Sequence, residues 1–80
     1  MRFRLAVDGL EIAMLSYDLG YGRTLKTHLI KALLYNGTMD ILSLVDVVRK
    51  NYEEYKYNEP KVFTAKIAEL IKEGIIEPDE

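Results

Sequence analysis

Residues 60–76, PKVFTAKIAELIKEGII, carry the clearest structural pattern in this sequence. Apolar side chains recur in this stretch at the spacing of one helix face, namely Phe63, Ile67, Leu70 and Ile71. Pro60 suits the first position of such a helix, because its missing N–H would have no helical partner there. Gly74 is typical of a helix end, and Ile75–Ile76 is typical of a short buried strand. The stretch therefore predicts an amphipathic helix over residues 60–72 that leads directly into a strand.

A second, shorter helix is predicted upstream of helix 60–72, and a polar turn separates the two helices. Segment 53–58 is polar and rich in tyrosine, which is typical of a turn. Residues 39–42 look extended, and Ser43-Leu44-Val45-Asp46 has the form of a capping box in which Asp replaces the usual Glu or Gln. We therefore expect a helix that starts at Ser43 and turns Arg49 and Lys50 outward near its end.

Another helix is predicted over residues 25–35. Thr24 can cap its N-terminus, and Asn36–Gly37 can end it, because glycine adopts the left-handed backbone of a helix end. Its apolar arc is wide and contains Leu25, Leu29, Ile30, Ala32, Leu33 and Leu34. We expect this helix to be the most buried of the three.

The N-terminal segment, residues 1–17, allows two interpretations. It begins with the alternation of a half-buried strand at Phe3, Leu5 and Val7. Asp8–Gly9 is a preferred hairpin turn, after which a second strand can follow. Alternatively, Asp8 caps a helix through the spacing Asp8-x-x-Glu11, and Gly20 ends it. We favour the hairpin. Because a lone hairpin cannot bury its apolar side chains, we expect a homodimer interface at Phe3, Leu5, Ile12 and Leu15.

The composition limits the classes of protein that the chain can represent. With 80 residues and no cysteine, it predicts one domain over residues 1–80 that neither disulfides nor thiolate zinc sites support. Its apolar runs are too short to cross a membrane, and no cleavable leader is evident. We expect a small soluble protein of the cytoplasm, or of the host cytoplasm if its source is viral.

The net charge of −2 does not by itself favour a nucleic-acid partner. Three of the acidic residues, however, lie in the C-terminal tail 77–80, namely Glu77, Asp79 and Glu80. We expect this tail to be a solvated end, so that the charge neither supports nor excludes DNA binding.

The order helix, short strand, helix, turn, helix, glycine, strand in residues 25–76 resembles the winged helix-turn-helix domains of small bacterial, archaeal and viral transcription regulators. Two segments carry the resemblance, ILSLVDVV over residues 41–48 and FTAKIAELIKEGII over residues 63–76. The second segment looks like the recognition helix of that family. The resemblance implies an α+β, predominantly helical fold, in which a three-helix unit meets a small antiparallel sheet. It also implies a sequence-specific, DNA-binding regulator of transcription whose helix 60–72 enters the major groove. We expect this regulator to be a homodimer, because one short helix makes few contacts and a second copy across a symmetric site multiplies the specificity.

Two features depart from the pattern of that family. The turn after the second helix is long and acidic, with Glu53, Glu54 and Glu59. Only four residues follow Ile76, so we expect a wing either to come from the N-terminal hairpin or to be absent.

The side of helix 60–72 that points away from Ile67 is the predicted DNA-binding face. It comprises Lys61, Val62, Ala65, Glu69 and Lys72, with Thr64 and Lys66 at its flanks. Lysines and Thr64 can bond guanine or phosphate, Val62 and Ala65 can touch thymine methyl groups, and Glu69 can accept from cytosine. Arg49, Lys50 and Lys56 are further candidates for phosphate contacts, although Arg49 and Lys50 also suit the negative end of a helix.

Other motifs are weaker. Gly20-Tyr21-Gly22-Arg23 precedes a helix, where an anion can bind, but it lacks the ending of a P-loop and is interpreted as a flexible connector. His28 is the only histidine and is expected on a helix surface or half-buried, without metal partners. Tyr52, Tyr55 and Tyr57 are interpreted as packing residues. The sequence therefore predicts no catalytic site, no metal and no cofactor, and the protein is not expected to be an enzyme.

A different class of protein is the alternative interpretation. The acidic turn, the acidic tail and the missing wing strand all favour a protein–protein interaction module, such as an accessory subunit or a viral-type inhibitor, on the same fold.

Overall fold

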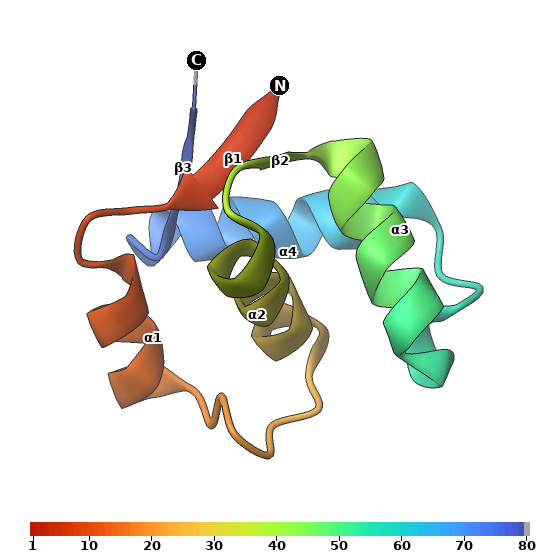
Figure 1. The fold of residues 1–80 in the computed structure, drawn as a ribbon, viewed down its shortest axis with the longest axis horizontal. Helices are drawn as coiled ribbons and strands as arrows, with labels where there is room; N and C mark the ends of the chain where they lie inside the picture. Colours follow the sequence, from red (N-terminus) through yellow and green to blue (C-terminus); the bar gives the residue numbers. More distant parts are fainter. Residues whose placement is uncertain (80) are drawn as a thin grey trace.

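The structure is a computed structural model, and it describes residues 1–79. In chain order its elements are β1 (Arg2–Leu5), α1 (Gly9–Ser16), α2 (Leu25–Asn36), β2 (Met39–Asp40), α3 (Ile41–Asn51), the 3-10 turn η1 (Glu53–Tyr55), α4 (Pro60–Lys72) and β3 (Ile76–Pro78) (Figure 1). Figure 1 shows α2 in front of α4, with α1 and α3 on opposite sides of α2. The predicted α+β, predominantly helical class with a small antiparallel sheet is confirmed.

The sheet has the strand order β2-β1-β3, so the N-terminal strand is its centre. Phe3 pairs with Met39 on one side, and Leu5 pairs with Ile76 on the other, both in antiparallel register. The first strand of the chain thus joins the strand that precedes α3 to the strand that follows α4. This pairing also brings the first strand and the last strand of the described residues side by side (Figure 1).

The predicted N-terminal hairpin is wrong in its second strand, which is replaced by helix α1. Asp8 precedes this helix but makes no side-chain capping bond, and the helix ends at Ser16 rather than at Gly20. The helix packs tightly on the rest of the chain, because a Cβ atom on Gly9 would overlap the carbonyl oxygen of Ile75. The backbone N–H of Ala6 also donates to that oxygen, at 2.9 Å. Asp8–Gly9 therefore lies at the corner between strand β1 and helix α1, and not in a hairpin turn.

Most of the side chains that were predicted to form a homodimer interface are packed inside the chain instead. Phe3 is buried in the core, and Leu5 and Ile12 pack against it. Leu15 alone of the four expected interface residues is strongly exposed.

Helix α2 is the most buried helix, as predicted. The hydroxyl oxygen of Thr24 accepts from the backbone N–H of Thr27 at 3.2 Å and caps the helix, and Gly37 ends it with a φ of 77°. Leu29 and Ile30 are fully buried, whereas Leu34, which the sequence placed in the apolar arc, is exposed. Around α2 the core is completed by side chains of every neighbouring element, including Phe3, Leu44, Val48, Phe63, Ile67, Leu70, Ile75 and Ile76.

Helix α3 begins at Ile41, two residues earlier than predicted. Asp40, not Ser43, is its N-cap, and the Asp40 carboxylate accepts from the backbone N–H of Ser43 at 2.8 Å. This bond lowers the pKa of the Asp40 carboxyl group. Asp is as good a capping residue as Ser, and Asp40 has the extended backbone that a cap requires because it is paired with Arg2 in the sheet.

Helix α4 has the predicted bounds, and it ends as predicted at a glycine. Gly74 has a φ of 83°, and the following N–H of Ile75 donates to the carbonyl of Leu70 at 3.0 Å. The chain then enters β3, so a strand follows the glycine as predicted, but it begins at Ile76, and Ile75 is buried just before it.

The predicted solvated tail 77–80 is wrong for its first residues. Glu77 lies in β3, and the backbone N–H of Asp79 donates to the carbonyl of Arg2 at 2.8 Å. Both carboxylates flank the guanidinium of Arg4, at 3.6 Å for Glu77 and 2.9 Å for Asp79. Glu80 lies outside the described residues. Within residues 1–79, no helix has the length and apolar character needed to cross a membrane.

Candidate functional site

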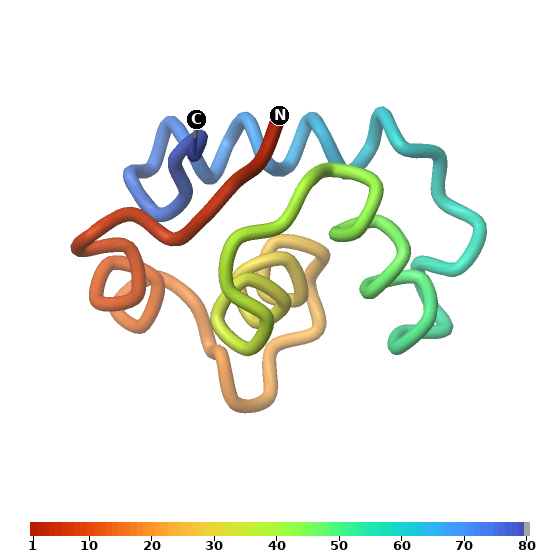
Figure 2. The backbone as a smooth tube through the Cα atoms, turned by 45° about the horizontal axis from the view of Figure 1, so that its top comes forward, coloured from red at the N-terminus to blue at the C-terminus, as the bar shows by residue number. Residues whose placement is uncertain are grey.

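The outer side of α4 is the central part of the predicted DNA-binding face. Figure 2 shows α4 along the upper edge of the molecule. Burial of its apolar stripe fixes the rotation of the helix and leaves Lys61, Thr64, Ala65, Ala68 and Lys72 exposed. Ala68 was missed in the sequence, although it follows Ala65 at i+3 and so lies on the same face.

Lys61 and Thr64 occupy the N-terminal end of this face. The Lys61 side chain is 82% exposed, and its ammonium lies 3.2 Å from the carboxylate of Glu59, also strongly exposed. An ion pair of this kind adds little stability and leaves the lysine free to exchange partners. The hydroxyl of Thr64 donates to the carbonyl of Lys61 at 3.0 Å, within the same turn.

Val62 was predicted on the exposed face of α4, but it does not lie there. It is half-buried and packs against the core, because the apolar arc of α4 is wider than the stripe through Phe63 and Ile67. The predicted contact of Val62 with thymine is therefore not supported by its position.

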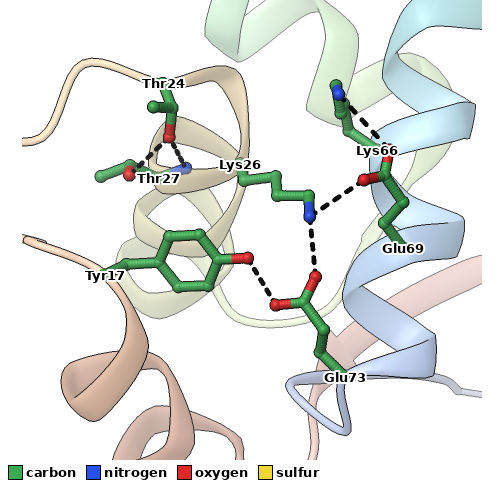
Figure 3. A network of polar contacts seen from close by, with 7 residues as sticks. All are labelled: Tyr17, Thr24, Lys26, Thr27, Lys66, Glu69 and Glu73. Atoms are coloured by element: carbon green, nitrogen blue, oxygen red, sulfur yellow. Dashed lines mark hydrogen bonds and ion pairs between the residues drawn. The ribbon is translucent and has the colours of Figure 1, made fainter.

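Lys66 and Glu69 belong to a polar network along one side of α4 (Figure 3). Lys26 of α2 lies at its centre, with its ammonium 2.7 Å from Glu73 and 3.0 Å from Glu69. Tyr17, which follows α1, donates its hydroxyl to Glu73 at 2.5 Å, and Lys66 lies 3.4 Å from Glu69. The network thus connects α2 and α4 with the end of α1.

The charges of this network compensate one another. Glu73 above all raises the pKa of Lys26, and Glu69 adds to this. In return Lys26 lowers the pKa values of Glu73 and Glu69. The carboxylate of Glu69, which belongs to the predicted DNA-binding face, is thus neutralised by Lys26 from within the molecule.

Arg49 lies between α3 and the turn that leads to α4. Its guanidinium donates to the backbone carbonyl of Asn58 and lies 5.7 Å from the ring centre of Phe63. Arg49 therefore holds the start of α4 in place and is less available to DNA than predicted. Lys50 and Lys56 are exposed and line a hollow of about 340 Å³ together with Asp46 and Arg49.

The tyrosines of the turn differ in their surroundings. Tyr52 and Tyr55 pack against the core, as predicted, and the Tyr55 hydroxyl donates to the carbonyl of Arg23 at 2.7 Å. Tyr57 is exposed, so its predicted packing role is wrong. The ammonium of Lys56 lies 5.6 Å from its ring.

The segment predicted to be a flexible connector is an organised turn. The Asp18 carboxylate accepts from the backbone N–H groups of Gly20 and Tyr21, at 3.1 and 2.9 Å. The N–H of Gly22 donates to the carbonyl of Asp18 at 2.7 Å. His28, which follows on α2, is buried rather than on a surface or half-buried as predicted, because the rings of Tyr52 and Tyr55 cover it.

Within residues 1–79, no cluster of three histidine, aspartate or glutamate side chains is placed to hold a metal ion. Comparison with protein-family models, with curated proteins and with solved structures finds no match for the chain.

Proposed function

We propose that the protein is a small regulator of transcription that binds double-stranded DNA by inserting the outer side of α4 into the major groove. The observation that carries this proposal is the composition of that side. Ala65 and Ala68 form its middle, Thr64 flanks them, and Lys61 and Lys72 stand at its two ends. Small side chains permit close approach to base edges, while the lysines can reach the phosphates on either side of the groove.

The packing around α4 supports the proposal. Helices α3 and α4 follow one another across a turn and both pack on α2, an arrangement that resembles a helix-turn-helix unit. Strand β1 pairs with β3 at the place where a winged helix would carry its second wing strand. We therefore include in the proposal that the chain has a fold of the winged helix-turn-helix kind.

The distribution of ion pairs also supports it. Arg4 compensates Glu77 and Asp79, and Lys26 compensates Glu69 and Glu73. Among the described residues, Lys50, Lys56 and Lys72 have no carboxylate within ion-pair distance, and they lie on α4 or beside the turn that precedes it. Their ammonium groups are therefore free to contact the phosphates of a duplex that lies along α4.

We further propose that the DNA-binding form is a homodimer. One short helix contacts few base pairs, and a second copy across a symmetric site multiplies the specificity.

A protein–protein interaction module is the competing proposal. The observation that favours it is the exposure of large apolar side chains in and before α1, which is 97% for Val7, 66% for Met14 and 84% for Leu15.

A pair of matched double variants tests the DNA-binding proposal. Lys61→Glu with Lys72→Glu reverses both charges on the outer side of α4. Arg23→Glu with Lys31→Glu makes the same change of net charge at a hollow beside the turn Gly20–Arg23, and this turn lies at the opposite edge of the molecule from α4 (Figure 2). Binding to a labelled random duplex is measured by fluorescence anisotropy.

We expect the first double variant to lose at least about tenfold more affinity than the second, since it removes direct phosphate contacts. Equal losses in the two double variants would show that α4 is not the DNA-binding element.

A further inference from the structure

A pocket lies at the edge of the molecule remote from the outer side of α4. Its volume is about 340 Å³, which is within the range of sites for small molecules. The turn Gly20–Arg23 forms one wall, and α2 contributes His28 and Lys31. The end of α3 contributes Tyr52.

His28 is the buried polar residue of this pocket. The residue is 2% exposed, and neither of its ring nitrogens has a hydrogen-bond partner among residues 1–79. Nε2 lies 3.5 Å from the carboxylate of Glu54, which is too far for a well-formed hydrogen bond. A buried ring with two unsatisfied nitrogens carries a cost in free energy that a bound ligand can remove.

The charged groups around the pocket are mainly cationic. Arg23 and Lys31 line it, and neither has a carboxylate within ion-pair distance among the described residues. Glu54 is the acidic residue that faces His28, while the neighbouring faces of the ring are occupied by Tyr52 and Tyr55. Two cationic side chains and a buried imidazole therefore converge on one hollow.

The backbone of the turn cannot supply the anion site that the glycines suggest. Asp18 already occupies the N–H groups of Gly20, Tyr21 and Gly22. Any anion must be bound by side chains such as that of Arg23, whose backbone carbonyl accepts from the Tyr55 hydroxyl at 2.7 Å. The candidate anion site is thus formed by side chains and not by the backbone N–H groups of the turn.

We propose that this pocket binds the phosphate group of a small phosphate monoester, with Arg23 and Lys31 as its cationic ligands and His28 as a buried hydrogen-bond donor. Two positive side chains match the charge of a phosphate monoester, and the volume admits an attached group of nucleoside size. Tyr21, which is strongly exposed at the rim, can cover such a group.

The phosphate is that of a free small molecule rather than of the DNA backbone. In Figure 2 the turn Gly20–Arg23 lies at the lower edge of the molecule and α4 at the upper edge. A duplex bound along the outer side of α4 would be remote from the pocket. The proposal is independent of DNA binding and holds or fails separately from it.

NMR titration of the intact chain tests the proposal. The probes are inorganic phosphate, adenosine 5′-monophosphate and adenosine, each followed through the ring signals of His28, which is the only histidine. We compare the unmodified chain with Arg23→Gln, with Lys31→Gln and with the control Arg2→Gln, which removes an equal charge from an exposed site outside the pocket.

We expect saturable shifts of the His28 signals with the two phosphate-bearing probes, at a dissociation constant of about 1 mM or tighter for the nucleotide. Arg23→Gln and Lys31→Gln should each weaken binding by about tenfold or more, while Arg2→Gln leaves it unchanged.

Three results would overturn the proposal. These are the absence of saturable shifts with the phosphate-bearing probes, equal binding of adenosine and its monophosphate, and equal effects of the control and the pocket variants. If a short duplex saturates the His28 signals and the free phosphates do not, the site binds DNA phosphate instead and the assignment to a small molecule is wrong.

Discussion

The imidazole of His28 stacks on the ring of Tyr52, with the ring centroids 3.6 Å apart and the planes inclined by 14°. The stack places the only histidine of the chain under the turn that joins α3 to α4. Burial lowers the pKa of His28, and Lys31 and Arg23 act in the same direction, whereas Glu54 opposes them. The neutral imidazole is therefore favoured in the folded protein.

Protonation of His28 should destabilise the fold. Its contribution to stability is fully present above the ordinary histidine pKa of 6.5 and is lost as the pH falls below this value toward the lowered pKa of the folded state. NMR titration in phosphate-free buffer should give a midpoint below 6.5, and Glu54→Gln should lower the midpoint further. A midpoint at or above 6.5 in the unmodified protein would contradict the burial of this ring.

Replacement of Lys26 by Met should destabilise the protein, since it leaves Glu69 and Glu73 without their shared cation. The loss, measured by urea unfolding at neutral pH, should exceed the ~0.5 kcal/mol typical of surface substitutions. Lys72→Met, at an exposed position of α4, is the matched control and should stay within that limit.

The effect of Lys26→Met should also depend on pH with a defined sign. Glu73 and Glu69 have lowered pKa values, so the stability that they contribute is present above pH 4.5 and is lost as the pH falls through those lowered values. The difference between variant and unmodified protein should therefore shrink in acid. A difference that stays constant down to low pH would show that it has another cause, such as lost packing of the lysine stem.

The position of the α3 cap predicts unequal effects of two neighbouring substitutions. Asp40→Ala removes the acceptor for the N–H of Ser43 and should lower the urea midpoint, whereas Ser43→Ala removes a hydroxyl that does not cap the helix. Thr24→Ala at the start of α2 provides the scale, with an expected loss of about 1 kcal/mol. A larger effect at Ser43 than at Asp40 would restore the start of α3 predicted from the sequence.

Gly9 is expected to be intolerant of any side chain. Alanine at this position would bring its Cβ onto the carbonyl oxygen of Ile75, so α1 would have to move away from the core. We expect a loss of about 2 kcal/mol or more for Gly9→Ala. Gly20→Ala is the control, because its Cβ would meet only the Asp18 side chain at 3.6 Å. Equal stabilities of the two variants would mean that α1 does not pack as described.

Helices α2 and α4 are predictable from the sequence because their signals agree with one another. In α4 the apolar stripe, Pro60 and Gly74 all indicate the same bounds, and in α2 Thr24 and Gly37 do so. The N-terminal segment differs, since Asp8–Gly9 suits both a hairpin turn and a helix start. Contact with Ile75, remote in the sequence, decides between them.

The candidate site was only partly predictable, for a related reason. Helical periodicity places Lys61 and Ala65 on an outer face, but it does not show which elements meet. Lys26 and Glu73 lie 47 residues apart, so their pairing, and with it the compensation of Glu69, depends on tertiary packing. The burial of His28 likewise depends on tertiary packing, because Tyr52, which stacks on its ring, lies at the C-terminal end of another helix, α3.

The most direct test of the central claim is the salt dependence of DNA binding by the unmodified protein. Fluorescence anisotropy with a labelled random duplex, at low and then at moderate salt, measures the affinity, and light scattering in the same buffers gives the oligomeric state. We predict micromolar or tighter binding at low salt that weakens steeply as salt rises, because lysines displace counterions from the phosphates. No binding at low salt would contradict the proposed DNA-binding role of α4 and would favour the protein–protein interaction module.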